Sequence, residues 1–300
     1  MGWLTGWAYR KSHVINGATG AGTNYQIRIK AHYGSGTDSG EDVYLNSHSR
    51  TDFGDVRFTD DDGTTLLDYW MEEYVDSDYA IFWVEVQDDL GTDQTIYIYY
   101  GKSDATTTSS GSDTFVVFDD FEGSTALSTR LNYATSGGGV GNYELSTSWA
   151  KHNSYSFRYY ESSSTDDGSV EAYSTVSETE QYCTEVWVKP SFDNPPKDYH
   201  FGLLLDDQYA MTVGDIGADN DPRIGVYDVS IRDYAEYDST TTPSQETVYK
   251  LVLKKNNDSS FSLEWYDESG TLIDSYTTTG SYTQNRAGIF AKSGNAEYGD

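Results

Sequence analysis

An acidic run in the first third of the chain, GDVRFTDDDG at residues 54–63, has the spacing that most suggests metal chemistry. A calcium loop of the EF-hand type needs oxygen ligands at alternate positions, glycine at the sixth and glutamate at the twelfth. Placing Gly63 sixth puts Phe58 first and Tyr69 last, and neither side chain can coordinate a hard cation. We therefore expect a short strand followed by a solvated hairpin turn, with a looser metal site as the alternative.

A second pattern with catalytic potential is Glu236-Tyr-Asp238-Ser-Thr-Thr241. Glycoside hydrolases can carry Glu-x-Asp-x-x-Glu on one strand, which supplies both the nucleophile and the acid. Thr241 stands where the second glutamate would be, so the acid is missing. The five histidines are far apart and no GxSxG motif occurs, so neither a local zinc site nor a nucleophile elbow is indicated. We therefore expect a protein that is not an enzyme and keep a glycoside hydrolase as the alternative.

The charge of the chain excludes one class of partner. Its 300 residues contain 49 Asp and Glu against 19 Lys and Arg, a formal net charge of −30. Nucleic-acid binding needs clustered basic side chains, and only Arg10-Lys11 and Lys254-Lys255 are adjacent. So dense an acidic surface is typical of proteins adapted to molar salt, where a Debye length of ~3 Å screens self-repulsion. We expect a halophilic source, the alternative being an ordinary acidic extracellular protein.

Targeting and membrane signals are not evident in the sequence. No apolar run approaches the ~20 residues that a membrane helix needs. Residues 1–11 lack the basic start and the apolar core of a signal peptide. We therefore expect a chain that does not insert into a membrane and has no export signal.

Apolar residues recur with period two along much of the chain, and helical periodicity is almost absent. At residues 25–32 apolar and polar side chains alternate, which predicts a strand with one face in solvent. Residues 81–86 and 96–99 are apolar on both faces, so these strands should be central or covered. Residues 249–253 and 261–265 alternate in a matching pattern and predict a hairpin. These patterns predict an all-β chain of two antiparallel β-sandwich, jelly-roll-like domains in tandem.

The segment ATTTSSGSD at residues 105–113 has the composition of a flexible connector. An apolar run that reads as a new strand, FVVFDDFE, follows it directly. We therefore expect one domain over residues 1–110 and a second over residues 114–300.

Four blocks mark the first domain: WAYRK at 7–11, DVRFTDDDG at 55–63, YAIFWVEV at 79–86 and IYIYYGKSDA at 96–105. Their order and spacing resemble an uncharacterised domain-of-unknown-function family, with W-x-Y-R-K, D-x-R-F-T-D and I-Y-x-Y-Y-G blocks, of archaeal and bacterial surface and secreted proteins. The resemblance covers residues ~5–105. It implies a β-sandwich module without established catalysis.

The second domain resembles a laminin-G/concanavalin-like jelly roll in three segments: FDDFEG at 118–123, EVWVKP at 185–190 and the hairpin at 249–270. Such folds frequently hold a structural calcium between the opening and closing strands. The resemblance assigns Asp120 and Glu122 to the opening element and Asp300 to the closing one. A structural calcium is the only cofactor that it implies. The alternative is that these carboxylates only add to the acidic surface.

Aromatic residues are the remaining signal, with 27 Tyr and 7 Trp. Tyr and Trp stack on sugar faces and anchor protein interfaces, but they are also good strand formers that fill cores. The tyrosines expected in loops of the second domain are the candidates for ligand binding. They are Tyr199, Tyr209, Tyr234 and Tyr237.

We therefore expect a non-enzymatic structural and surface-recognition protein of a halophilic system. A surface-type module without a signal peptide favours a virion component, such as a tail fibre, spike or capsid decoration, located extracellularly or on the virion surface. Its expected partners are a host-surface glycan or protein, other virion proteins and copies of itself. A cell-surface adhesin of a halophilic archaeon and a glycoside hydrolase are the alternatives.

Overall fold

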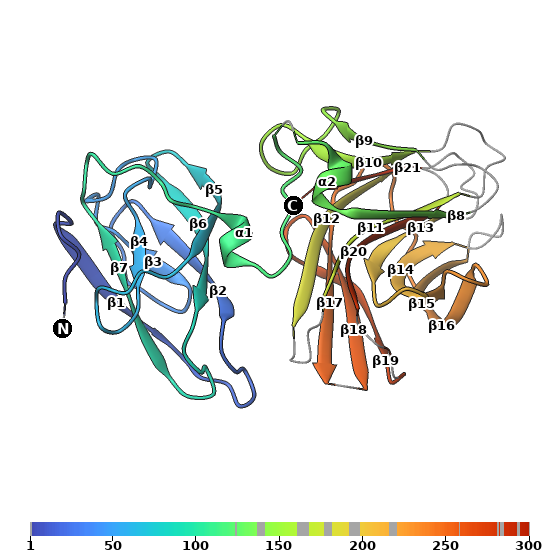
Figure 1. Cartoon of the computed structure of the whole chain (residues 1–300), viewed down its shortest axis with the longest axis horizontal. Helices are drawn as coiled ribbons and strands as arrows, with labels where there is room; N and C mark the ends of the chain where they lie inside the picture. The colour runs from blue at the N-terminus through green and yellow to red at the C-terminus, as the bar shows by residue number, and fades with distance from the viewer. Residues whose placement is uncertain are drawn as a thin grey trace. The chain divides into compact units, whose positions relative to one another are not determined.

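The computed structural model describes residues 2–123, 125–136, 142–160, 168–176, 182–191, 199–215, 221–257, 259–280, 282, 285–292 and 295–299. They form two compact units, residues 1–118 and 119–300 (Figure 1). Both units are built almost entirely of strands, so the predicted all-β class with two sandwiches is confirmed. Among the described residues, no helix has the length and apolarity that crossing a membrane requires.

The first unit is a sandwich of two small sheets. Their strand orders are β1-β7-β4 and β3-β2-β6-β5, and every pair is antiparallel except β2 with β3. Side chains with period-two spacing, such as Ile29 with Ala31 and Ile96 with Ile98, fill the core between the sheets. The elements are β1 (Tyr9–Ile15), β2 (Tyr25–His32), β3 (Asp42–Tyr44), β4 (Arg57–Thr59), β5 (Tyr69–Val75), β6 (Tyr79–Val86), β7 (Gln94–Tyr100) and α1 (Gly111–Thr114).

A buried carboxylate joins the sequence blocks of this unit. Asp55 has no solvent exposure, and it accepts hydrogen bonds from the backbone N–H groups of Arg50, Gly101 and Lys102 at 2.7–3.0 Å. The indole of Trp7 donates to the carbonyl oxygen of Asp55 at 2.7 Å. A buried charge is tolerated only when it is hydrogen-bonded in this way. These hydrogen bonds therefore hold together three of the sequence blocks, those that begin at Trp7, Asp55 and Ile96.

Strand β4 is buried on both faces, although its alternation of apolar Val56 and Phe58 with Arg57 and Thr59 is typical of a half-buried strand. Arg57 is 6% exposed and Thr59 is fully buried. On this side of the sheet, the guanidinium of Arg10 lies 4.5 Å from the ring of Trp3 and 4.3 Å from that of Tyr97. The N-terminal residues thus cover the sheet, which a local pattern cannot reveal. The turn after β4 is as predicted, with the N–H of Gly63 donating to the carbonyl of Asp60 at 3.0 Å.

The expected connector packs on the first unit. The N–H of Met71 donates to Oγ of Ser109 at 2.7 Å, and the N–H of Ser110 donates to the carbonyl of Tyr69 at 2.9 Å. The segment at 105–113 therefore does not run as a free linker, because its hydroxyl and backbone groups bond to β5.

The run FVVFDDFE after the connector predicted a new strand, but these residues do not form one. Phe118 packs on Trp70 with ring centroids 4.8 Å apart, and Phe115 packs on Trp83 at 6.0 Å. These rings cover the outer face of β5 and β6. The division between the units therefore lies between Phe118 and Asp119, after the position suggested by the sequence.

The second unit is a larger sandwich of two seven-stranded sheets, with orders β19-β18-β17-β12-β21-β10-β9 and β16-β15-β14-β13-β20-β11-β8. All of its strand pairs are antiparallel. Its elements are α2 (Leu127–Arg130), β8 (Asn132–Ser136), β9 (Asn142–Ser146), β10 (Ser156–Tyr160), β11 (Ser169–Thr175), β12 (Cys183–Ser191), β13 (Tyr199–Leu204), β14 (Tyr209–Asp215), β15 (Pro222–Asp228), β16 (Asp233–Ser239), β17 (Tyr249–Asn257), β18 (Ser260–Asp267), β19 (Leu272–Thr278), β20 (Arg286–Lys292) and β21 (Asn295–Gly299).

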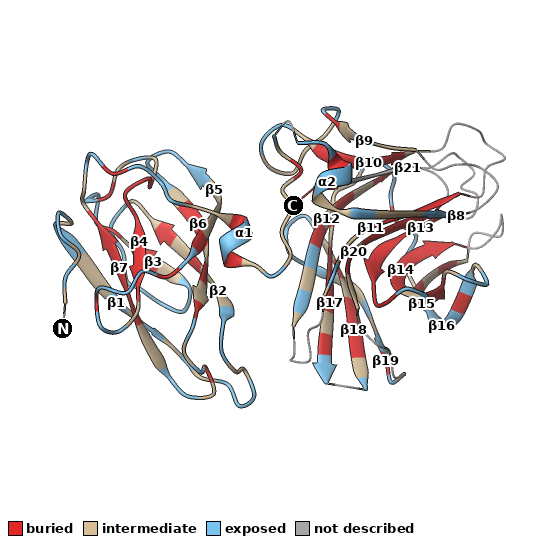
Figure 2. Cartoon of the chain, in the orientation of Figure 1, coloured by how far each residue is buried: buried red, intermediate tan, exposed pale blue. Residues whose placement is uncertain are grey.

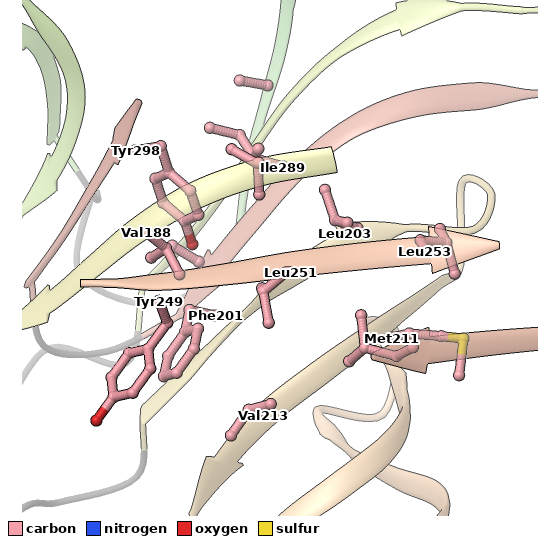
Figure 3. Packing of buried hydrophobic residues seen from close by; sticks show 14 of the residues in the cluster. Val188, Phe201, Leu203, Met211, Val213, Tyr249, Leu251, Leu253, Ile289 and Tyr298 are labelled. Atoms are coloured by element: carbon pink, nitrogen blue, oxygen red, sulfur yellow. The ribbon is translucent and has the colours of Figure 1, made fainter. Parts of the chain in front are cut away.

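The core of the second unit lies between the two sheets. Figure 3 shows side chains from β13, β14, β17 and β20 meeting there. The predicted late hairpin is confirmed as β17 and β18, with Leu251 opposite Trp265 and Leu253 opposite Leu263. These four side chains are at most 1% exposed.

Candidate functional site

The sheet β16-β15-β14-β13-β20-β11-β8 has a second layer of packed side chains, on the face that points away from the core. Five apolar residues form a separate cluster there: Leu204, Ala210, Tyr227, Tyr234 and Phe290. We call this the aromatic face. Its centre is buried and its rim is exposed, and Figure 2 shows buried residues along β14 and β15 and exposed ones on the edge strand β16.

Four rings of the aromatic face form a connected group, with three at its buried centre and the fourth, Tyr237, at its exposed rim. The imidazole of His200 lies 4.4 Å from the ring of Tyr227 and 5.3 Å from that of Tyr234, between ring centroids. Tyr227 and Tyr234 meet edge to face at 5.6 Å, and Tyr234 contacts Tyr237 at 5.5 Å. Edge-to-face and tilted pairs at these distances are the favoured aromatic geometries. His200, Tyr227 and Tyr234 are 1–8% exposed, whereas Tyr237 is 44% exposed.

Hydrogen bonds fix the buried tyrosine of this cluster. The hydroxyl of Thr212 donates to the hydroxyl of Tyr234 at 3.1 Å, and Tyr234 donates to the carbonyl oxygen of Arg223 at 3.2 Å. Burial raises the pKa of Tyr234 well above its ordinary value, so this phenol stays protonated and remains a donor. Tyr234 is therefore a rigid part of the face.

A β-bulge places the two tyrosines of β16 on the same side. Tyr234 pairs with Tyr227 and Tyr237 pairs with Gly225, although the tyrosines are three positions apart on β16 and their partners are only two positions apart on β15. Ala235 is the extra residue, since the register shifts beside it. In a regular strand, residues three apart point to opposite faces.

Glycines in this sheet allow neighbouring strands and rings to approach closely. A Cβ at Gly202 would lie 2.1 Å from the carbonyl oxygen of Met211. At Gly214 it would lie 2.3 Å from Nδ1 of His200, so the imidazole occupies the space that a side chain there would need. Both glycines therefore allow the strands and rings to approach closely.

Basic side chains border the rings. The guanidinium of Arg223 lies 4.2 Å from the ring of Tyr237 and also pairs with Asp221 at 3.1 Å. Nζ of Lys292 lies 5.5 Å from the ring of Tyr227, and Lys292 is 2% exposed.

A second arginine–tyrosine stack lies further along the same face. The guanidinium of Arg286 lies 4.2 Å from the ring of Tyr173 and forms an ion pair with Glu171. Burial raises the pKa of Glu171, because its carboxylate loses water that Arg286 only partly replaces.

The four candidate tyrosines are divided between the two faces of the sheet, and all four lie in strands rather than in loops. Tyr199 on β13 is 2% exposed and points into the core, as does the half-buried Tyr209 on β14. Tyr234 and Tyr237 on β16 belong to the aromatic face. The sequence predicts loops at these four tyrosines because the segments beside them contain Asp, which is common in turns.

The two described carboxylates of the expected calcium site form hydrogen bonds within the protein. Asp120 and Glu122 lie in an irregular segment and not on an opening strand. Oδ1 of Asp120 accepts the N–H of Glu122 at 3.0 Å, and Oε1 of Glu122 accepts the N–H groups of Ser154 and Tyr155 at 2.7 and 2.5 Å. Such side-chain to backbone bonds compete with strand formation. Asp300 lies outside the described residues.

No grouping of three or more His, Cys, Asp or Glu side chains suited to a metal ion occurs within the described ranges. Glu236, from the incomplete hydrolase pattern, faces the core side of β16, where it accepts a hydrogen bond from Tyr282 at 3.0 Å. Burial, with a further contribution from the nearby Glu236 carboxylate, raises the pKa of Tyr282 to about 12.

Sequence reasoning missed His200, Tyr227, Arg223 and Lys292. The available signal was glycine inside four strands of one sheet: Gly202, Gly214, Gly225 and Gly288. Interior strand glycines mark close approach, but only the sheet order places them on one face.

The profile of the family described as "Domain of unknown function (DUF2341)" matches residues 52–134. The match includes the second, third and fourth sequence blocks and extends into the second unit. No curated protein matches the chain.

Three solved structures give a measure of the fold likeness. A protein of unknown function from Shewanella oneidensis MR-1 is 21% identical, with 55% of this chain and 77% of that chain covered and a TM-score of 0.39. Cellulose induced protein, Cip1, is 14% identical, with 61% and 94% covered and a TM-score of 0.42. Lectin II from Ulex europaeus is 12% identical, with 56% and 92% covered and a TM-score of 0.38. Likenesses this distant assign no ligand.

Proposed function

We propose that the chain is a non-enzymatic recognition protein that binds a carbohydrate on the aromatic face of its second unit. The observation that carries this proposal is the contact chain from the exposed Tyr237 through Arg223 and Tyr234 to the buried His200. Tyrosine rings offer flat apolar surfaces to the C–H faces of sugars, while arginine donates to their oxygens. Because Tyr234 and His200 are buried, Tyr237 is held on a rigid base, which lowers the entropy cost of binding.

A hydrolase needs two carboxyl groups that flank the bond to be cut. Among the described residues, the strands of the aromatic face contribute only Glu171 to it, and Arg286 already engages that carboxylate. This arrangement supports binding without hydrolysis.

The test is a glycan-array screen of the purified chain, followed by titration of the best ligand against Tyr237→Ala. The ring of Tyr237 is 44% exposed, so its loss should weaken binding by about 10-fold and leave the thermal midpoint nearly unchanged. The matched control is Tyr25→Ala in the first unit, where a tyrosine with 41% exposure should not matter for binding. Glycan cleavage by the wild type, or no binding to any glycan, would overturn the proposal.

We further propose that the protein works in molar salt on the surface of a virion, with a cell-surface adhesin as the alternative. The net charge of −30 supports the salt adaptation. Screening of this charge should raise the thermal midpoint by several degrees between dilute and molar potassium chloride. An unchanged midpoint argues against salt adaptation. Antibody labelling of purified particles and of cell envelopes decides the location, and label on envelopes alone would favour the adhesin.

A further inference from the structure

The tip of the β17–β18 hairpin carries a sequence pattern that the proposed function does not use. Asn257 and Ser259 are the ends of an Asn-x-Ser sequence whose middle residue is not proline. No other asparagine of the chain has Ser or Thr at the second position after it. This pattern is the acceptor sequence for N-linked glycosylation, and a transferase can use it only where it lies at the protein surface.

Both ends of the pattern lie at the surface of the hairpin. Asn257 is the last residue of β17 and pairs with Ser260 of β18, after a shift in register between Lys255 and Asn257. The side chains of Asn257 and Ser259 are exposed. Exposed tips of this kind are where proteases gain access to a folded chain, and a transferase needs the same access.

One hydrogen bond orients the side-chain amide of Asn257. Its Oδ1 accepts the backbone N–H of Ser259 at 2.9 Å, which is the geometry of an Asx turn. Because Oδ1 is held against the backbone, Nδ2 lies on the side away from this bond. Within the described part of the chain, neither Nδ2 of Asn257 nor Oγ of Ser259 has a hydrogen-bond partner. The amide and the hydroxyl that the acceptor pattern requires are therefore both free.

The preceding asparagine differs in both respects. Nδ2 of Asn256 donates to Oγ of Ser262 at 3.2 Å and to Oγ of Ser260 at 3.4 Å. Its second position is Asp258, so it has no hydroxyl residue where the pattern needs one. Two adjacent asparagines thus give a matched comparison, in which only Asn257 is suited to modification.

We propose that Asn257 is the attachment site of an N-linked glycan, placed there by a transferase that recognises Asn-x-Ser. In the reaction, Nδ2 of Asn257 forms a bond to the anomeric carbon of the sugar, and the bond from that carbon to the diphosphate of the donor breaks. The diphosphate leaves with the electron pair, and a base of the transferase takes the amide proton. The donor is a glycosyl diphosphate, carried by a lipid or by a nucleotide. The hairpin belongs to the sheet opposite the aromatic face, so this inference is independent of the proposed function.

The experiment offers the folded chain to both kinds of donor. One arm contains a solubilised oligosaccharyltransferase with a lipid-linked oligosaccharide, and the other contains a soluble N-glycosyltransferase with UDP-glucose. Mass spectrometry of the intact chain and of its peptides should show one added glycan in at least one arm, on the peptide that contains Asn257. The arm that reacts identifies the carrier. The same peptide from protein isolated from its native source should also carry a glycan.

Four variants assign the glycan to a residue. Asn257→Gln and Ser259→Ala should each lose the added mass, because one removes the acceptor and the other removes the hydroxyl. Ser259→Thr retains a hydroxyl and should keep the added mass. Asn256→Gln is the matched control and should keep it too. All four thermal midpoints should stay close to that of the wild type, because these side chains are exposed.

Three results would contradict the proposal. If both arms leave the folded chain unmodified while a synthetic peptide of residues 250–265 is modified, the folded hairpin is not an acceptor. Retention of the added mass in Asn257→Gln would place the glycan on another residue. An unmodified Asn257 in the native protein would overturn the proposal whatever the two transferases do.

Discussion

Both sheets of the second unit direct four basic side chains outward, but the two faces use them differently. On the sheet β19-β18-β17-β12-β21-β10-β9 each basic residue pairs with a glutamate, and we call this the ion-pair face. The pairs are Lys189–Glu246 at 2.6 Å, Lys250–Glu185 at 3.2 Å, Lys254–Glu264 at 2.7 Å and Arg158–Glu144 at 3.2 Å. On the aromatic face Arg286 pairs with Glu171 and Arg223 with Asp221, and both guanidinium groups also stack on tyrosine rings, Tyr173 and Tyr237.

The difference separates a surface of exposed ion pairs from one of buried rings and buried charged groups. Exposed ion pairs contribute about 0–1 kcal/mol each and tolerate replacement. Rings and charges that are buried on an outer face cost desolvation and restrict which residues fit. Substitutions of similar size should therefore have unequal effects on the two faces, which gives three tests.

The largest effect is expected at Gly202. In Gly202→Val, a Cβ would meet the carbonyl oxygen of Met211 at 2.1 Å, so the strands must separate. Unfolding free energy in urea should fall by about 4 kcal/mol or more, or the variant should fail to fold. Ser275→Val on the exposed part of β19 is the control and should change stability by less than about 0.5 kcal/mol. Similar losses in both variants would erase the distinction between the faces.

A smaller loss is expected for Tyr234→Ala, which removes the ring contacts with His200 and Tyr227 and the hydrogen bond to Thr212. Denaturation should show a loss of about 3 kcal/mol. Tyr266→Ala is the counterpart on the ion-pair face, where the half-buried ring should cost about 1 kcal/mol. If Tyr234→Ala proves as mild as Tyr266→Ala, the aromatic cluster is not a packed layer.

The smallest effect concerns pH and compares one carboxyl group from each face. Burial raises the folded-state pKa of Glu171, so its contribution to stability is present below the ordinary value of 4.5 and is lost as pH rises through the folded pKa. Burial also acts to raise the pKa of Glu264, but hydrogen bonds from Lys254 and Tyr266 outweigh it and lower the pKa. The contribution of Glu264 is therefore present above 4.5 and lost as pH falls through the lowered value.

Urea denaturation of Glu171→Gln and Glu264→Gln between about pH 3 and 7 checks these signs. The stability of wild type relative to Glu171→Gln should decrease as pH rises. Relative to Glu264→Gln it should increase. If the stability difference between wild type and variant changed with pH in the same direction for both variants, the two carboxyl groups would have similar environments.

Much of the fold was predictable because it depends on local alternation. The β17–β18 hairpin and the strands at β2, β6 and β7 follow directly from period-two spacing. The segment at 105–113 was misread because Ser and Thr are common in free linkers, and only the tertiary contacts reveal that Ser109 bonds to Met71. Likewise, the cover over β4 comes from Trp3 and Arg10, which lie far away in sequence.

The candidate site was only partly predictable, for a related reason. Tyrosine content pointed to Tyr234 and Tyr237, but nothing local separates them from Tyr199, which fills the core. The side of the sheet depends on register, and the bulge at Ala235 changes the register without a composition signal. His200 and Lys292 become neighbours only through the pairing of β13 with β20.

The bulge in β16 makes the chemistry of the aromatic face depend on chain length as well as on side-chain identity. If Ala235 paired with Val226 in a regular ladder, Glu236 would take the place of Tyr237 opposite Gly225 and bring a carboxylate next to Arg223. A carboxylate would then replace a tyrosine ring on this face. Deleting the single codon for Ala235 would therefore exchange the side chains on the two faces of this strand in one step, whereas point substitutions would have to exchange two residues. The length of this strand is therefore as much a constraint on the surface chemistry of the face as its side chains are.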